Sequence, residues 1–241
     1  MANVMRAAFV LAPLGLAVVW LLTACSEPPG TSLFPLDQGR SWTYRLTSEW
    51  ENSTSERETV VLTNVGRDST LDSGAAFRRR SDSGIDYWLR ADATGIYRVA
   101  TKMDVEEAPN LDPKPRYVLK APIAVGTGWP ASTTTYLLRR RADFPPEIRH
   151  SHPSVPMVYT VEALDQPVET PAGAFAHCVK VRGDAKLKLF SDPVKGWQDM
   201  PLTTLEWYCP GVGLVRVERS EPANSTFLLG GTMKMELMSW N

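Results

Sequence analysis

Two histidines one residue apart, His150 and His152, are the residues of this sequence best spaced to bind a metal ion. On a β-strand, alternate side chains share a face, so both imidazoles could reach one ion. The same segment contains Pro145, Pro146 and Pro153, however, and this composition favours a loop. A tight site also needs three or four ligands, and no further His or Cys is near in the sequence. We therefore interpret the pair as solvent-exposed loop histidines, and we expect no metal or other cofactor.

The sequence contains none of the short motifs that mark common catalytic sites. It has no Gly-x-Ser-x-Gly elbow, no His-Glu-x-x-His pair and no glycine-rich phosphate loop. The 27 Asp and Glu residues leave room for a carboxylate pair of the glycosidase type, but no spacing joins any two of them. We expect a protein that is not an enzyme, and an unrecognised hydrolase is the less favoured alternative.

The first 24 residues differ from the rest of the chain. Arg6 is the only charged residue before Glu27, and the uncharged stretch between them is rich in Ala, Val and Leu. It ends in Leu22-Thr23-Ala24-Cys25, which matches the lipobox of bacterial lipoproteins. The cysteine at the last position supplies the thiol that accepts the diacylglycerol. The pattern predicts a signal peptide over residues 1–24 and lipidation of Cys25.

A transmembrane helix is the alternative interpretation of this stretch, because its length is close to the 20 or so residues that span a bilayer. Pro13 and Gly15 weaken a long helix there. With the lipobox, we expect a lipidated tether over residues 25–32 and a single β-rich domain over residues 33–241. Ser26 is not the Asp that retains lipoproteins at the inner membrane. In a host with two membranes we therefore expect the outer membrane, with the domain facing the periplasm.

Charge and cysteine content narrow the class of protein further. Without Arg6, 25 basic residues face 27 acidic ones, and this balance argues against nucleic acid as a partner.

Once Cys25 carries lipid, Cys178 and Cys209 remain, and exported proteins keep disulfides. A disulfide is favoured over two free thiols. Strand periodicity argues against it, since Cys178 is in phase with lysine and arginine, whereas Cys209 is in phase with Leu205 and Trp207.

Two arginine triplets, at residues 78–80 and 139–141, are the only dense charge runs. On a strand, the middle arginine points opposite to its neighbours. The runs fit either contact with an anionic lipid, glycan or partner, or a solvated face with one arginine paired inside, and the second interpretation is favoured.

Apolar and polar residues alternate with a period of two along most of the chain, which is typical of antiparallel strands with one buried face. Turn signals at Asp72–Gly74, Asp82–Gly84, Asp92–Gly95 and Pro210-Gly211 separate the strands. We expect an all-β fold, a curved antiparallel sheet forming a half-barrel or open barrel, with little helix beyond the signal segment. The expected strands include Trp42–Leu46, Glu58–Arg67, Ala75–Arg80, Asp86–Ala91, Ile96–Thr101, Arg116–Lys120, Thr133–Arg141, Met157–Ala163, Val179–Leu189, Thr203–Tyr208, Leu214–Arg219 and Met233–Leu237.

Three segments together resemble a broad set of bacterial envelope lipoproteins close to the TapB-like group. They are Pro35-Leu36-x-x-Gly39-x-x-Trp42-x-Tyr44, Thr170-Pro171-Ala172-Gly173-x-Phe175-x-x-Cys178-x-Lys180-Val181 and Glu206-Trp207-Tyr208-Cys209-Pro210-Gly211-Val212-Gly213-Leu214-Val215. The resemblance implies an envelope location and a β-rich fold, but no activity. The family often has a small apolar residue where Cys209 stands. The expected fold is also similar to lipoprotein carriers of the LolA and LolB type.

From these observations we expect a lipid-anchored envelope protein that binds a partner protein or an apolar or glycan ligand without catalysis. The alternative is a structural or assembly lipoprotein without a ligand pocket. An open, apolar-lined concave face would favour a small ligand or lipid, and a filled core with an exposed apolar patch would favour a protein partner. Seven tryptophans beyond the signal segment could line such a face, although core packing is their more common role.

Overall fold

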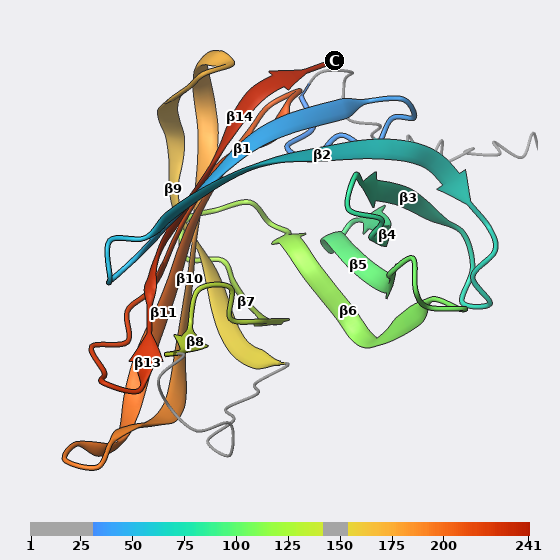
Figure 1. Cartoon of the computed structure of the whole chain (residues 1–241). Helices are drawn as coiled ribbons and strands as arrows, with labels where there is room; N and C mark the ends of the chain where they lie inside the picture. The colour runs from blue at the N-terminus through green and yellow to red at the C-terminus, as the bar shows by residue number, and fades with distance from the viewer. Residues whose placement is uncertain (1–30, 142–153) are drawn as a thin grey trace, which may run out of the picture.

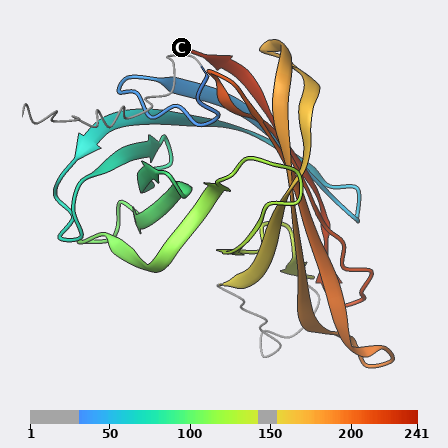
Figure 2. The same ribbon diagram turned by 180° about the vertical axis from the view of Figure 1, so that it is seen from behind.

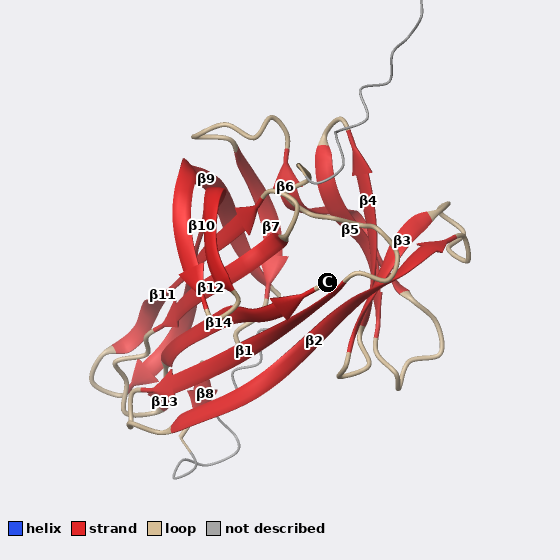
Figure 3. Ribbon diagram, turned by 90° about the horizontal axis from the view of Figure 1, so that it is seen from above, coloured by secondary structure: helices blue, strands red, loops and turns tan. Residues whose placement is uncertain are grey.

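The computed structural model describes residues 31–141 and 154–241, and these residues contain strands but no helix. The all-β prediction is therefore confirmed, and no helix in these two ranges has the length and apolar character to cross a membrane. Figure 3 shows strands joined by loops throughout. The strands are β1 (Ser41–Trp50), β2 (Ser55–Asp68), β3 (Ala76–Ser81), β4 (Asp86–Asp92), β5 (Gly95–Lys102), β6 (Asn110–Lys120), β7 (Gly128–Thr133), β8 (Arg139–Arg140), β9 (Val155–Thr170), β10 (Gly173–Asp192), β11 (Gly196–Cys209), β12 (Gly213–Glu221), β13 (Leu228–Leu229) and β14 (Gly231–Trp240).

Twelve of these strands form one antiparallel sheet in the order β6-β5-β4-β3-β2-β1-β14-β12-β11-β10-β9-β7. The sheet curls until its two edge strands, β6 and β7, approach each other (Figures 1 and 2). These two strands are not neighbours in the hydrogen-bonded sheet, so the sheet forms a nearly closed barrel with one unsealed seam. The open-barrel prediction is confirmed. The remaining strands, β8 and β13, pair with each other as a small separate ribbon.

Prolines explain why the seam does not close as a ladder. β6 contains Pro113 and Pro115, and β7 contains Pro130, so both edge strands lack N–H donors that a ladder needs. Side chains bridge the seam instead. The Arg116 Nε donates to the carbonyl oxygen of Ser132 at 2.7 Å, and the Trp129 Nε1 donates to the carbonyl oxygen of Tyr117 at 3.2 Å.

The interior of the barrel is filled by side chains that alternate along the strands. Val161 on β9 lies opposite Val181 on β10, and both are fully buried. Trp129 on β7 stacks on Tyr159 of β9 with ring centroids 5.9 Å apart. This main core draws its buried residues from β4, β6, β7, β9, β10, β11 and β13, from Phe34 before the first strand, and from Ala223 and Phe227 between β12 and β13. Of the seven tryptophans, the four at positions 42, 50, 88 and 129 are buried, as expected for core packing.

A second buried cluster lies where the long β9–β10 hairpin meets β1, β12 and β14. The Ala172 N–H donates to the carbonyl oxygen of Leu237, and the rings of Phe175 and Trp240 lie 5.3 Å apart. In Figure 1 this hairpin rises beside the end of β14. The cluster ties the hairpin to strands that are distant in the sequence.

Cys178 and Cys209 form a disulfide within this second cluster, and both are buried. The phase argument against the bond was wrong. Lys180 pairs directly with Trp207 across β10 and β11, so the lysine and the tryptophan lie on one face of the sheet, and both cysteines share it. The Lys180 ammonium lies 5.4 Å from the centre of the Trp207 ring, which explains how an aromatic residue is placed on the same face as a charged one.

The prediction of a strand over Thr133–Arg141 was wrong. β7 ends at Thr133, and only Arg139 and Arg140 form a short strand after it. Between them, the backbone N–H groups of Tyr136, Leu137 and Leu138 donate to the buried carboxylate of Glu221. Because a side chain satisfies these donors, the segment needs no neighbouring strand.

Candidate functional site

The segment Leu33–Gln38 crosses one end of the barrel before β1 begins, and we call it the entry strap. Phe34 is its buried anchor, with its ring 6.4 Å from that of Tyr208 on β11. The guanidinium carbon of Arg79 lies 4.2 Å from the centre of the Phe34 ring and 4.5 Å from the centre of the Trp42 ring. These cation–π contacts fix the strap to the inside of β1 and β3.

Hydrogen bonds from buried side chains hold the backbone of the entry strap. The Arg79 Nη2 donates to the carbonyl oxygen of Pro35 at 2.9 Å, and its Nε donates to the Asn64 Oδ1 at 2.8 Å. The Asn64 Nδ2 donates to the carbonyl oxygens of Pro35 and Asp37. Burial lowers the pKa of Arg79 to about 10, so the guanidinium stays charged at neutral pH. The prediction that one arginine of the 78–80 run points inside is confirmed.

A cavity of about 540 Å³ lies between the entry strap and strands β2, β3, β4, β5 and β6. This volume is within the usual range for sites that bind small molecules. Its apolar lining comes from both the strap and the barrel strands. Its polar lining residues are Ser32, which is half-buried, and Asp37, Gln38, Arg67 and Asp92, which are exposed. The apolar lining residues are Leu33, Phe34, Pro35, Leu36, Phe77, Ala91, Ile96, Leu119, Ala121 and Ile123.

The two carboxylates beside this cavity have structural partners. Asp92 accepts hydrogen bonds from the Thr94 hydroxyl, the Thr94 N–H and the Tyr97 hydroxyl, and the Thr94 side chain is the main reason that its pKa is lowered. A lowered pKa suits a turn-stabilising carboxylate and does not suit a general acid. Asp37 lies 3.8 Å from the Arg40 guanidinium. The cavity therefore has the features of a binding site more than those of an acid–base site.

Glu206 is the second notable group, because its side chain points into the barrel interior. It lies between Val181 of β10 and Val217 of β12 in the register and accepts a hydrogen bond from the Tyr208 hydroxyl at 2.5 Å. Burial raises the pKa of Glu206, and the neighbouring Tyr208, Arg116 and Arg219 oppose this effect. Tyr159 responds to the same surroundings, since burial raises its pKa to about 12.

The end of the barrel opposite the entry strap is closed by an ion pair. Arg219 and Glu221 are both buried, and the Arg219 Nε donates to the Glu221 carboxylate at 2.5 Å. Arg219 also donates to the Thr133 hydroxyl and to the carbonyl oxygen of Thr134. With the three N–H groups of residues 136–138, this carboxylate is fully occupied, so we assign it a structural role.

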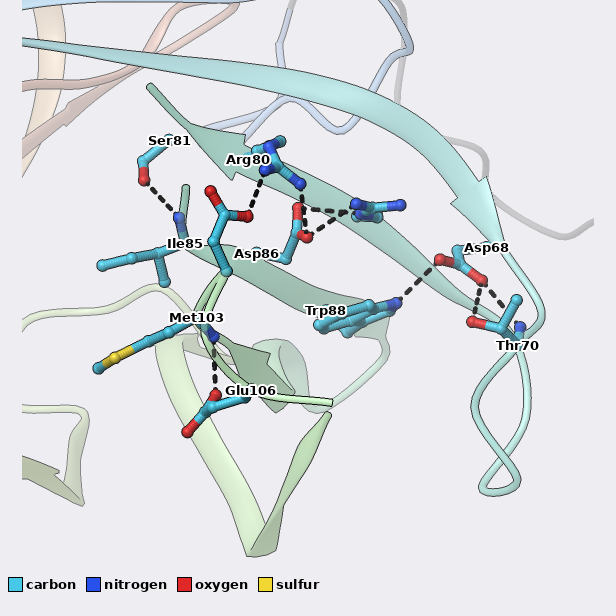
Figure 4. Close-up of polar contacts among 11 residues, drawn as sticks. Asp68, Thr70, Arg80, Ser81, Ile85, Asp86, Trp88, Met103 and Glu106 are labelled. Atoms are coloured by element: carbon cyan, nitrogen blue, oxygen red, sulfur yellow. Dashed lines mark hydrogen bonds and ion pairs between the residues drawn. The ribbon is translucent and has the colours of Figure 1, made fainter. Parts of the chain in front are cut away.

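The outward-facing arginines of the first triplet belong to the ion-pair network drawn in Figure 4. The carboxylate of Asp86 accepts from Arg78 at 2.7 Å and from Arg80 at 3.1 Å, and Arg80 also reaches Asp104. In the second triplet, Arg139 lies over the Trp50 ring with its guanidinium carbon 4.2 Å from the ring centre. Arg78, Arg80 and Arg139 therefore interact with carboxylates or aromatic rings of the protein itself.

The residues singled out from the sequence are not brought together at one site. Cys25, His150 and His152 lie outside the described residues. His177 is exposed and lies 3.1 Å from Asp165. Within the described part of the chain, no group of three His, Cys, Asp or Glu side chains is arranged to hold a metal ion.

Sequence reasoning did not identify Asn64, Glu206 or Glu221 as special. Each lies on a strand whose pattern looks ordinary, and only its inward phase marks it. The sequence signal that could have identified these residues is a polar residue in phase with buried apolar neighbours. Glu206, for example, is in phase with Leu202 and Tyr208. The cavity had no such signal, because its lining comes from separate segments.

Comparison with known proteins gives a distant likeness of fold. No family model and no curated protein matches the chain. A candidate lipoprotein from Parabacteroides distasonis is 14% identical over 88% of this chain and 99% of its own, with a TM-score of 0.38. A candidate exported protein from Bacteroides fragilis, with a YmcC-like fold, is 15% identical over the same shares, with a TM-score of 0.39. Similarity at this level establishes neither a shared ligand nor a shared activity, and it gives no support to the TapB-like resemblance in particular.

Proposed function

We propose that this protein is a lipid-anchored, non-catalytic protein of the cell envelope that binds an apolar ligand, such as the acyl chain of a lipid, in the cavity beneath the entry strap. The observation that carries the proposal is the cavity itself, which combines a volume of about 540 Å³ with an apolar lining. A ligand with one apolar part and one polar part would match the apolar walls and the exposed polar residues.

The position of the cavity supports a membrane lipid as the ligand. The lining begins at Ser32, and Cys25 lies only seven residues earlier. A fully extended segment of this length spans roughly 25 Å, so lipid on Cys25 would keep the cavity close to the membrane surface. The sequence supports the outer membrane facing the periplasm in a host with two membranes, because Ser26 follows the cysteine.

The filled core distinguishes this proposal from a wide-open carrier. Valine, leucine, methionine and aromatic side chains occupy most of the barrel interior, so the ligand site is confined to the strap end. The exposed large apolar residues are scattered over strands β2, β6, β9, β11 and β14 and over several turns, and the two most exposed, Val105 at 90% and Val194 at 95%, lie in the β5–β6 and β10–β11 turns. Small-ligand binding therefore has better support than a protein partner or a purely structural role.

Native mass spectrometry of the chain extracted from its own membrane tests the ligand. We expect a co-purifying lipid on the wild-type protein and its loss from Ile123→Trp, which fills the cavity from its lining. Val158→Trp is the matched control, because Val158 is 57% exposed and lies outside the cavity. A wild-type protein without lipid, or equal lipid on both variants, would contradict the proposal.

The anchor is tested separately by labelling cells with a radioactive fatty acid. We expect label on the wild-type chain and none on Cys25→Ala. Equal labelling of the two chains would refute the anchor without deciding whether the cavity binds a ligand.

A further inference from the structure

A second hollow of about 590 Å³ lies on a different part of the surface, over strands β1, β2, β11, β12 and β14. The sheet register explains its floor. Thr232 on β14 pairs with Ser220 on β12, and Ser220 pairs with Thr203 on β11. Three short hydroxyl side chains therefore form one row across three neighbouring strands, and we call this hollow the hydroxyl groove.

Longer side chains from the flanking rows form the walls of the groove. Neighbouring strands are about 4.8 Å apart, and alternate residues along a strand are about 6.7 Å apart, so the lining forms a regular grid. Glu236 accepts from Arg45 at 3.0 Å and from Lys234 at 2.6 Å, which holds these three side chains in place. Arg57 lies opposite Thr47 at the β2 side. Short residues between long ones create a depression on an otherwise regular sheet.

The charges of the groove balance. Apart from Arg219, whose guanidinium is buried against Glu221, its cations are Arg45, Arg57 and Lys234, and its carboxylates are Glu49, Glu218 and Glu236. A strongly charged ligand would therefore meet as much repulsion as attraction. Leu205 and Met233 are the apolar residues of the lining, and no Trp, Tyr or Phe is among the lining residues, so the groove lacks the aromatic anchors that are typical of a protein interface.

We propose that the hydroxyl groove binds an uncharged, hydroxyl-rich ligand, an oligosaccharide of the cell envelope. Such a ligand matches a grid of alternating donors and acceptors, because each sugar hydroxyl both donates and accepts a hydrogen bond. The groove shares no lining residue with the cavity beneath the entry strap. The protein would then hold a lipid at one end and a glycan on its side.

The test measures the binding of soluble oligosaccharides to the full lipidated chain held in nanodiscs. The panel contains peptidoglycan fragments, core oligosaccharides of lipopolysaccharide and linear glucans. We expect at least one member to bind the wild type with a Kd of about 1 mM or tighter. Thr232→Trp, at an exposed floor position, should weaken binding at least about tenfold, whereas Lys188→Trp, exposed on β10 and outside the groove, should not change it.

A second variant, Ser220→Leu, removes a floor hydroxyl and guards against a folding defect in the first. The circular dichroism spectrum of each variant should match that of the wild type. Failure of every oligosaccharide to bind, or equal weakening by Lys188→Trp, overturns the proposal. Capture of an envelope protein that depends on Thr232, without oligosaccharide binding, also overturns it and assigns the groove to a protein partner. Loss of lipid from the Ile123→Trp variant affects none of these outcomes.

Discussion

The two ends of the barrel are closed by buried arginines with different partners. At the far end, Arg219 pairs with the carboxylate of Glu221, and that carboxylate also accepts three backbone N–H groups. At the strap end, Arg79 interacts with a carbonyl oxygen, the side chain of Asn64 and two aromatic rings. No carboxylate pairs with Arg79 within the described residues.

The different partners of the two arginines suit the two ends of the barrel to different roles, one to stability and the other to binding. The far end joins residues 133–138 to β12 through Arg219 and through a carboxylate whose acceptor positions are all taken, so an incoming donor has little to gain there. The strap end is held by neutral acceptors and by apolar contacts, and it leaves a cavity. We infer that the far end stabilises the barrel and that the strap end can adapt to a ligand.

The largest effect is expected from Glu221→Gln. This change leaves the buried Arg219 without a counter-ion, which costs about 3–5 kcal/mol in the free energy of unfolding. Urea unfolding followed by tryptophan fluorescence measures it. Glu218→Gln is the control, because its pair with Arg216 is partly exposed and is worth less than about 1 kcal/mol. Equal losses in the two variants would remove the special role of the far end.

Removal of the disulfide should follow in size. Cys178 and Cys209 are separated by 31 residues, and opening a loop of this length lowers the free energy of unfolding by about 3–4 kcal/mol in the chain-entropy model. The double variant Cys178→Ala, Cys209→Ala and the reduced wild type should lose similar amounts in urea unfolding. Hydrogen exchange should increase first in the β9–β10 hairpin. If exchange instead increased first in residues 133–138, the disulfide would be supporting the far end.

Arg79→Met should have a smaller global effect and a larger local one. The carbonyl oxygen of Pro35 keeps only its bond from Asn64, and the loss is about 1–3 kcal/mol. Amides of the entry strap should exchange faster, and lipid retention should fall. Arg182→Met, a change in the exposed ion pair with Asp184, should leave both properties close to wild type. An entry strap that stays protected in Arg79→Met would show that apolar contacts alone hold it.

Glu206→Gln should give the smallest effect, and one that depends on pH. Burial raises the pKa of Glu206 in the folded protein, so the contribution of this group is fully present below its unfolded pKa and is lost as the pH rises through the folded pKa. Glutamine does not ionise, so the Glu206→Gln variant does not lose this stability as the pH rises. Relative to wild type, its melting temperature should therefore be higher at pH 8 than at pH 4. A difference of the opposite sign would mean that Arg116 and Arg219 outweigh burial.

Much of the fold could be predicted from alternation alone. Val179, Val181, Leu187 and Leu189 face inward on β10 as their spacing of two requires. The same reasoning predicted a strand over residues 133–141 that is absent, because a carboxylate more than 80 residues away supplies the hydrogen-bond acceptors there. The phase of Cys209 with Trp207 was assigned correctly, but the conclusion that this face differs from that of Lys180 was wrong for a related reason. An apolar neighbour such as Trp207 indicates a buried face only when no cation from another strand lies over it.

The candidate sites were less accessible to prediction than the strands. The run at residues 78–80 indicated that one arginine would point inside, but its partners Asn64 and Pro35 could not be named. The cavity combines the entry strap with strands β2, β3, β4, β5 and β6, and the hydroxyl groove combines another set of five strands. Each depends on register between segments that are distant in the chain, and local pattern does not encode register directly.

The sequence by itself determined that the chain folds as antiparallel strands, where most turns fall, and which faces are apolar, because these properties arise from neighbouring residues. Its first 25 residues alone carry the expectation of a lipid anchor. Only the tertiary structure decided that the sheet would curl into a barrel with one open seam, that Phe34 and Arg79 would meet beneath the strap, and that three hydroxyls would align across β11, β12 and β14. These outcomes depend on long-range packing, in which each contact is favourable only after the others have formed.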